Sequence, residues 1–147
     1  MTEKWDRRFL ELAALVATWS KDPSTQFGAV ITTADRKGVF IGYNGFPRAM
    51  FDDPALYLNR EQKYSRIIHC EMNALLSAGT RAEGGTLYTY PFLSCDRCFV
   101  HMAQGGIKRF VAPKINDPSV VARWEPLLMK TRQYAQEMSL EIVEIEN

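Results

Sequence analysis

The strongest constraint on the fold of this chain is the order of its predicted elements from residue 85 onward. Strand-like and helix-like segments alternate there, with strands at 85–90, 108–112 and 140–145 and helices at 95–104 and 120–138. A strand that returns through a helix usually pairs in parallel with the preceding strand, through a right-handed crossover. This half of the chain therefore predicts a parallel sheet covered by helices.

The first half of the chain predicts a helix and a hairpin. Apolar residues from Trp5 to Trp19 recur at steps of four and three, as on one face of an amphipathic helix that ends before Pro23. Residues 28–33 and 38–43 are strand-like, and the short polar segment between them favours an antiparallel pair.

The middle of the chain is less regular. Residues 44–63 contain Gly and Pro without a clear period, and we expect a long loop with at most one helical turn. Residues 68–77 are expected to form a helix that ends at Gly79. Two tryptophans, Trp19 and Trp124, belong to apolar helical stripes and are expected in the core.

The composition fits one domain that spans residues 1–147. Hydrophobic residues make up 46% of the 147 residues and charged residues 24%, which is enough apolar material for a single core. The sequence has no repeat and no linker-like segment. We therefore predict an α/β fold, a three-layer α-β-α sandwich around a five-stranded mixed sheet.

The charge balance excludes one class of partner. Eighteen Lys and Arg residues against seventeen Asp and Glu residues give a net charge of +1, which argues against a protein that binds nucleic acid through one-signed charge. No run approaches the roughly 18 apolar residues of a membrane span, and the first residues lack the apolar core of a signal peptide. We expect a cytoplasmic protein without a membrane or nucleic-acid partner.

The cysteines and one histidine suggest a metal site. The chain has three cysteines, Cys70, Cys95 and Cys98, and an odd number without a secretory signal argues against a disulfide framework. The C-x-x-C pair then suggests redox chemistry or metal binding, since both thiols fall on one side of a first helical turn whose positive end favours thiolates. His69 could supply a third ligand, and three ligands are typical of a catalytic zinc site that keeps a position open for water.

Glu71 favours catalysis over a purely structural metal site. It follows His69 by two residues, and a carboxylate beside a zinc-activated water can accept and deliver protons. Its alternative role is to complement the helix N-terminus. A closed structural site would need a fourth ligand from His101 or Cys70, but Cys70 points about 100° away from His69 on a helix.

These residues match a known family pattern. H-x-E followed by C-x-x-C is the signature of the zinc nucleobase deaminases. From Trp5 to about Ile145 the chain resembles the cytidine deaminase superfamily, and within it the deoxycytidylate (dCMP) deaminases. The resemblance also rests on the segments SKDPSTQFGA at 20–29, GYNGFP at 42–47 and HCEMNA at 69–74.

The resemblance implies a reaction and a cofactor. The reaction is the hydrolytic deamination of dCMP to dUMP and ammonia, in which water attacks C4 of cytosine. One Zn²⁺ per chain would be held by His69, Cys95 and Cys98, and Glu71 would move the protons. The small-molecule partner would be a nucleotide, and the chain would form a homo-oligomer, commonly a hexamer or a dimer in this superfamily, with its size left open.

Four substrate-binding candidates are expected. The family pattern implies that Asn44 hydrogen-bonds the sugar or base, although Asn-Gly is also a common turn pair. Lys21 and Gln26 lie in a stretch that resembles the family's phosphate-proximal segment, with helix-end and strand-start chemistry as the alternative. Phe92 directly precedes the metal motif and is the best candidate to stack on a base. A further basic group could meet a phosphate or remain a solvated loop: Arg60, Lys63 and Arg66.

The chain departs from the family pattern in three places. Cys70 stands where the family usually has Ala, and we interpret it as a packing residue. Ser94 replaces the usual Pro before the first Cys and is expected to cap the helix that begins there. The segment 90–94 is one residue longer than usual, which leaves the base and sugar preference open.

Two other functions remain open at this point. The first is a deaminase of the same superfamily that acts on cytidine, CMP, a modified pyrimidine, a free base or a tRNA adenosine. The second is a non-catalytic zinc module that binds a partner. Glu71 and the absence of an obvious fourth ligand weigh against the module.

Overall fold

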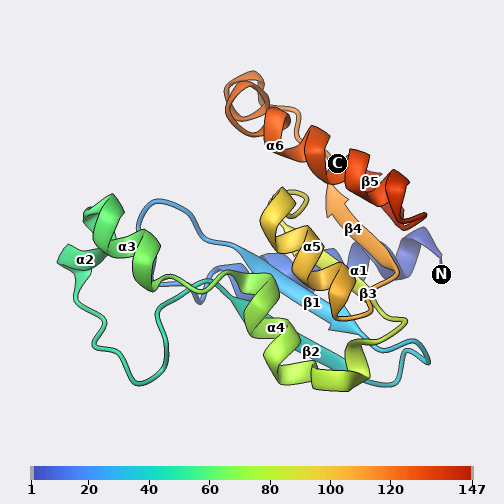
Figure 1. The fold of residues 1–147 in the computed structure, drawn as a ribbon, viewed down its shortest axis with the longest axis horizontal. Coiled ribbons are helices and arrows are strands. Elements are labelled where there is room, and N and C mark those ends of the chain that lie inside the picture. The colour runs from blue at the N-terminus through green and yellow to red at the C-terminus, as the bar shows by residue number, and fades with distance from the viewer. Residues whose placement is uncertain (1, 147) are drawn as a thin grey trace.

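A five-stranded sheet forms the centre of the computed structural model, which describes residues 2–146 (Figure 1). The strands are β1 (Gly28–Thr32), β2 (Val39–Tyr43), β3 (Thr86–Tyr90), β4 (Arg109–Pro113) and β5 (Glu141–Ile145). The helices are α1 (Glu3–Ala17), α2 (Pro54–Leu58), α3 (Arg60–Arg66), α4 (Cys70–Ala78), α5 (Asp96–Gln104) and α6 (Pro118–Glu137), and a 3₁₀ turn, η1 (Gly79–Ala82), follows α4.

The sheet is mixed, and its order is β2-β1-β3-β4-β5. The predicted hairpin is confirmed, because β1 and β2 pair antiparallel with Gly28 opposite Tyr43. The predicted parallel half is also confirmed, because β4 pairs in parallel with both β3 and β5. The sequence did not predict that β1 would lie between β2 and β3 and join the two halves through a second antiparallel pairing.

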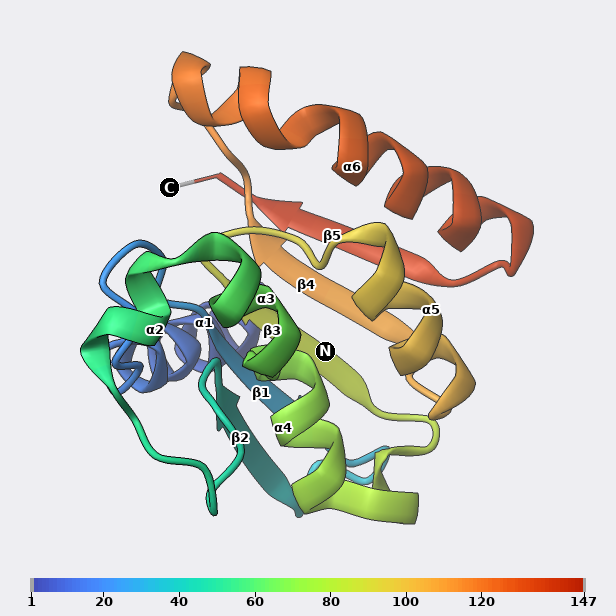
Figure 2. The same cartoon turned by 60° about the vertical axis from the view of Figure 1, so that its left-hand side comes forward.

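The two faces of the sheet are covered by different helices. Alternate side chains of a strand point to opposite faces, and on one face Val30, Tyr88 and Val111 pack with residues of α1. On the other face Ile31 and Phe110 pack in a larger core with residues of α4, α5 and α6. Figures 1 and 2 show α1 on one side of the sheet and α4 and α5 on the other, so the predicted three-layer α/β sandwich is confirmed.

One glycine in β2 lets α4 lie very close to the sheet. A Cβ atom at Gly42 would come within 2.4 Å of both the Cys70 carbonyl oxygen and the Ala74 backbone nitrogen. The first turn of α4 therefore rests directly on the backbone of β2, at a position where any side chain would collide with helix backbone.

The expectation of a loop over residues 44–63 was wrong in part. The chain forms α2 and the beginning of α3 there, and each helix starts at a side-chain cap. Asp53 accepts a hydrogen bond from the Ala55 N–H, and Asn59 accepts one from the Gln62 N–H. Helices of five and seven residues are too short to display a helical period, so the sequence pattern did not reveal them.

The expectation that both tryptophans lie in the core was also wrong. Trp19 is 48% exposed, because α1 ends at Ala17 and the indole lies beyond the helix, edge-on to Tyr43 of the outer strand β2. Trp124 is only half-buried and packs against Phe92 instead of entering the sheet core. Within residues 2–146, no helix has the length and apolar character required to cross a membrane.

Candidate active site

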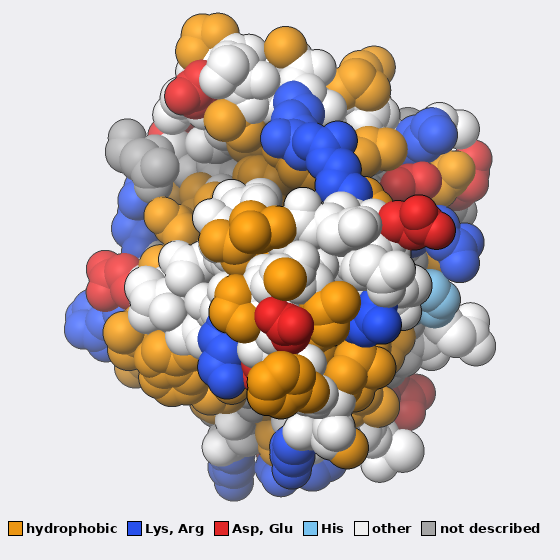
Figure 3. All heavy atoms as spheres, turned by 90° about the vertical axis from the view of Figure 1, so that its left-hand side faces the viewer, with side chains coloured by type: hydrophobic (Ala, Val, Ile, Leu, Met, Phe, Trp, Pro, Cys, Tyr) orange, Lys and Arg blue, Asp and Glu red, His pale blue; other side chains and the backbone are white. Residues whose placement is uncertain are grey.

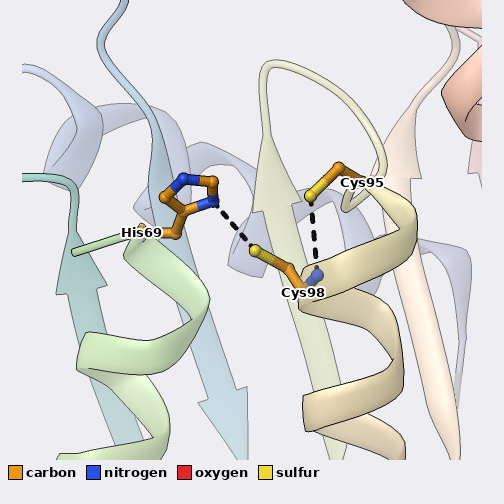
Figure 4. Close-up of side chains that lie close together, drawn as sticks. All are labelled: His69, Cys95 and Cys98. Atoms are coloured by element: carbon orange, nitrogen blue, oxygen red, sulfur yellow. Dashed lines mark hydrogen bonds between the residues drawn. The ribbon is translucent and has the colours of Figure 1, made fainter. Parts of the chain in front are cut away.

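Three side chains from two helix N-termini meet between α4 and α5 (Figure 4). His69 is the residue directly before α4, Cys95 is the N-cap of α5, and Cys98 lies in the first turn of α5. Their ligand atoms all lie within 4.8 Å of one another. His69 Nδ1 is 2.9 Å from Cys98 Sγ, so the structure brings the three predicted metal ligands together.

The donor set fits zinc. One imidazole nitrogen and two thiol sulfurs are donors that Zn²⁺ prefers, and three protein ligands are typical of catalytic sites. Neither candidate for a fourth ligand joins the group within residues 2–146. His101 is exposed on α5, and the Cys70 thiol bonds instead to Glu71.

The two cysteines affect each other's ionisation. The neighbouring Cys98 thiol lowers the pKa of Cys95 below the usual thiol range, and the neighbouring Cys95 sulfur raises the pKa of Cys98. The Cys98 backbone N–H also points at Cys95 Sγ, 3.5 Å away, at the positive end of α5. The site thus favours a thiolate, the form of cysteine that binds metals.

Glu71 lies beside the metal ligands and is almost buried, with 6% of its surface exposed. Its Oε1 accepts a hydrogen bond from Cys70 Sγ at 3.0 Å. Burial, followed by the neighbouring charge of Glu71, raises the pKa of Cys70 well above its usual value, so this sulfur remains a protonated donor. Cys70 packs in the core as expected and also makes this contact.

A cavity of about 650 Å³ opens onto these groups and is lined by His69, Glu71 and Cys95. This volume lies within the roughly 300–1,000 Å³ that small-molecule sites occupy. Phe92 and Trp124 form an aromatic wall of the cavity with their ring centroids 5.2 Å apart.

Positively charged side chains also line the cavity. Arg60, Arg97 and Arg123 reach it from α3, α5 and α6, and none of them forms an ion pair with another residue between 2 and 146. Lys63 is different, because its Nζ lies 2.6 Å from Asp22 Oδ2 in a buried pair. Figure 3 shows the face that carries α2 and α3, where hydrophobic side chains and Lys or Arg side chains both reach the surface.

Two of the four predicted substrate-binding residues line this cavity. Phe92 contributes to its wall, and Asn44 lines it while bracing the loop before β1. The Asn44 Oδ1 accepts from the Phe27 N–H at 2.8 Å, and its Nδ2 donates to the Thr25 carbonyl at 3.0 Å. Asn44 therefore has a structural task whether or not it also contacts a ligand.

Lys21 and Gln26 do not line the cavity. Lys21 is exposed and pairs with Asp52 at 2.9 Å, and the Gln26 amide donates to the Ser20 carbonyl at 2.8 Å. Gln26 therefore joins the two ends of the loop between α1 and β1, which is the helix-end and strand-start chemistry considered above. Lys21 instead links that loop to Asp52, in the loop that follows β2.

The expectation that Ser94 caps the following helix was wrong. The helix begins one residue later, so Cys95 occupies the N-cap position. The buried Ser94 hydroxyl has no hydrogen-bond partner within the described chain, while its carbonyl accepts from Thr131 at 2.9 Å. The segment that contains Phe92 and Ser94 does form part of the cavity wall.

Sequence reasoning missed the contribution of α6. Arg123 and Trp124 line the cavity, and the Arg123 guanidinium lies 5.1 Å from the centroid of the Trp124 ring. Nothing in the helical period indicates that Arg123 and Trp124 reach this cavity, because periodicity identifies a covered face without identifying what covers it.

Comparison with known proteins identifies the family. Residues 3–114 match the family model described as "Cytidine and deoxycytidylate deaminase zinc-binding region". The chain belongs to this deaminase family. It is 36% identical over 142 residues to a protein of Aliivibrio fischeri named "Uncharacterized deaminase in luxG 3'region", covering 97% of this chain and 94% of the relative. It is 34% identical over 122 residues to the deoxycytidylate deaminase of Homo sapiens, covering 78% of this chain and 68% of the relative.

Solved structures support the fold. The dCMP deaminase of the cyanophage S-TIM5 in its apo form superposes with a TM-score of 0.74 at 17% identity, covering 99% of this chain and all of the phage chain. RibD of Acinetobacter baumannii superposes with a TM-score of 0.66 at 21% identity, covering 97% of this chain but 35% of RibD. The chain thus has a cytidine deaminase-like fold and is a zinc-dependent hydrolytic deaminase, and the cluster of His69, Cys95 and Cys98 could hold the metal.

Proposed function

We propose that this protein hydrolyses dCMP to dUMP and ammonia. The observation that carries the proposal is one cavity lined by two of the metal ligands, His69 and Cys95, and by Glu71. The same cavity is lined by three arginines, Arg60, Arg97 and Arg123. Guanidinium groups without carboxylate partners suit a phosphate, which they can bind through paired hydrogen bonds. Relatives named deoxycytidylate deaminase, at 34% identity, support dCMP as the nucleotide.

The positions of the side chains support the following catalytic roles. Zinc, when bound to His69, Cys95 and Cys98, would supply hydroxide at neutral pH by acidifying a water. Glu71 takes the first proton of the attacking water and delivers it to N3 of cytosine. It then passes the second proton to the leaving amino group. A C4–O bond forms and the C4–N bond breaks, so dCMP and water become dUMP and ammonia.

The remaining cavity residues would position the nucleotide. The Phe92 ring offers a face for the base, since base–aromatic stacking contributes about 1–3 kcal/mol. Asn44 would contact the sugar or base with the lone pair of Oδ1 that its bond to Phe27 leaves free. Because Lys21 and Gln26 lie outside the cavity, they carry no role in this proposal.

We further propose that the enzyme is a cytoplasmic homo-oligomer. Zinc-binding thiols must stay reduced, which is the usual state in the cytoplasm. The outer strand β2 presents Val39, Ile41 and Tyr43 on an exposed face beside Trp19, and an apolar edge of this kind suits a second copy of the chain. Light scattering during gel filtration tests the assembly, and a monomer at assay concentrations would contradict it.

Ammonia release from a substrate panel tests the reaction. The zinc-loaded protein is incubated separately with dCMP, CMP, deoxycytidine, cytosine, 5-methyl-dCMP, guanine and a tRNA anticodon stem-loop. We expect release from dCMP with the highest kcat/KM. If another compound released ammonia and dCMP did not, that compound would replace dCMP as the proposed substrate. No release from any compound would favour a non-catalytic zinc module.

Replacing an arginine tests the phosphate contact separately. We expect Arg123→Ala to raise KM for dCMP about tenfold, the loss of one charge-assisted contact, while the weaker reaction of deoxycytidine stays unchanged. Arg8→Ala is the matched control, because Arg8 is exposed on α1, which covers the opposite face of the sheet. Equal effects on dCMP and deoxycytidine would remove Arg123 from phosphate recognition.

A further inference from the structure

We propose that Cys70 is a positioning residue for Glu71. Its thiol donates to Glu71 Oε1 at 3.0 Å, and Oε2 has no hydrogen-bond partner within residues 2–146. One oxygen of the carboxylate is therefore held while the other is left for proton transfer. This inference rests on the proposed role of Glu71 and concerns a side chain to which the family pattern assigns no function.

The thiol is held in a fixed place. Cys70 is 3% exposed and belongs to the main core, together with Ala74 of the same helix and Ile31 of β1. Its backbone rests against β2, since a Cβ at Gly42 would lie 2.4 Å from the Cys70 carbonyl oxygen. A donor that cannot move is able to fix the group that accepts from it.

The hydrogen bond also defines the direction of the Glu71 side chain. Consecutive side chains on a helix point about 100° apart, so they do not ordinarily face each other. Here the Glu71 carboxylate turns back along the start of α4 to meet Sγ of its neighbour. Both residues line the cavity, so the contact orients the carboxylate toward the space where a substrate would lie.

The usual family pattern has no counterpart of this contact. The family usually has Ala between the His and the Glu, and an alanine side chain has no hydrogen to donate to a carboxylate. Cys70 thus adds a directional restraint that packing alone would not provide. The prediction is an effect on the rate of the chemical step, with little effect on binding.

Two substitutions of similar volume separate the hydrogen bond from packing. Cys70→Ser keeps a donor, whereas Cys70→Ala removes it, and both shrink the buried side chain. With the best substrate of the panel above, we expect Cys70→Ala to lower kcat about threefold to tenfold, the effect of one modest hydrogen bond, with KM and zinc content unchanged. Cys70→Ser should recover most of that loss. Equal kcat in both variants, or a wild-type kcat in Cys70→Ala, would overturn the proposal.

A spectroscopic measurement tests the contact without any substrate. In the zinc-loaded protein Cys95 and Cys98 would bind as thiolates, so Cys70 would be the one thiol that retains an S–H bond. Its infrared S–H stretch should move to higher wavenumber in Glu71→Ala, because the acceptor has been removed. An unchanged band would refute the hydrogen bond, even if the substrate proposal were correct. A shifted band in a protein that released no ammonia would leave the contact established and refute the proposed reaction alone.

Discussion

The Glu71 side chain is almost buried and also lines the cavity, and both properties suit a carboxylate that transfers protons to a bound substrate. A carboxylate that is 6% exposed is protected from bulk water, yet it lines the same cavity as the metal ligands His69 and Cys95. A purely structural carboxylate at a helix N-terminus would bond to the backbone amides of its own first turn. The Glu71 carboxylate instead accepts from the thiol of Cys70.

Replacing Glu71 with Gln should separate metal binding from catalysis. The amide keeps the shape of the side chain but cannot accept the proton of the attacking water. We expect Glu71→Gln to retain zinc, since the metal is held by His69, Cys95 and Cys98, and to lose about 10²- to 10⁴-fold in kcat. Metal analysis and ammonia release on the same preparation measure both properties. Appreciable turnover in this variant would remove Glu71 from its proposed role.

At the scale of elements, α3 depends on one buried ion pair. A helix of seven residues is not stable alone in water, so its place over the cavity must come from tertiary contacts. Lys63 Nζ lies 2.6 Å from Asp22 Oδ2, with 10% and 0% of the two side chains exposed. Asp22 also accepts from the Ser24 N–H at 2.9 Å, so the same carboxylate joins α3 to the loop before β1.

Breaking this pair from one side should be costly. Lys63→Met leaves the Asp22 carboxylate buried without its cation, and we expect the free energy of unfolding to fall by about 3 kcal/mol. Adding Asp22→Asn should recover part of the loss, because the uncompensated charge is then gone. Urea unfolding of the single and double variants measures this coupling. Lys21→Met is the matched control, since its exposed pair with Asp52 should contribute little. Equal losses in the two lysine variants would contradict the prediction.

The elements also show how far the sequence could predict this protein. The strands and the parallel half were predictable, because alternating patterns and strand-helix-strand order are local properties. The metal ligands were predictable for the same reason, since Cys95 and Cys98 share one helical turn. Arg60 belonged to a basic group that the sequence offered for a phosphate, but its place beside the same cavity as Arg123 could not be predicted, because the two residues lie far apart in the chain. The pairing of β1 with β3 is likewise a long-range choice with no local signal.

At the scale of the molecule, a buried cluster ties α1 to the sheet on the side away from the cavity. Asp6 of α1 accepts two hydrogen bonds from Arg109 of β4, at 2.7 and 2.6 Å, and one from the Tyr88 hydroxyl of β3 at 2.8 Å. Burial alone would raise the pKa of Asp6, but the bonds from Arg109 and Tyr88 outweigh it and leave this pKa lowered. The charged form of Asp6 is thus favoured by folding.

Because the pKa of Asp6 is lowered by folding, the free energy of unfolding should depend on pH. A carboxyl whose pKa is lower in the folded state contributes stability above its ordinary value of 3.8, and loses it as the pH falls through the folded value. We expect Asp6→Asn to reduce the free energy of unfolding by about 3 kcal/mol at neutral pH. The difference in free energy of unfolding between the wild type and the variant should become smaller below pH 3.8, as measured by urea unfolding. A gap that stayed constant with pH would refute the linkage.

The close approach of α4 to β2 bears on which mutations this protein can tolerate. Gly42 binds nothing and lies outside both metal motifs, yet any side chain there would press on the backbone of Cys70 and Ala74. Such pressure would push the start of α4 outward and carry His69 away from the two sulfurs of α5. In a random mutational survey, Gly42 should therefore be as intolerant of substitution as the ligands themselves, although it contributes no chemistry of its own.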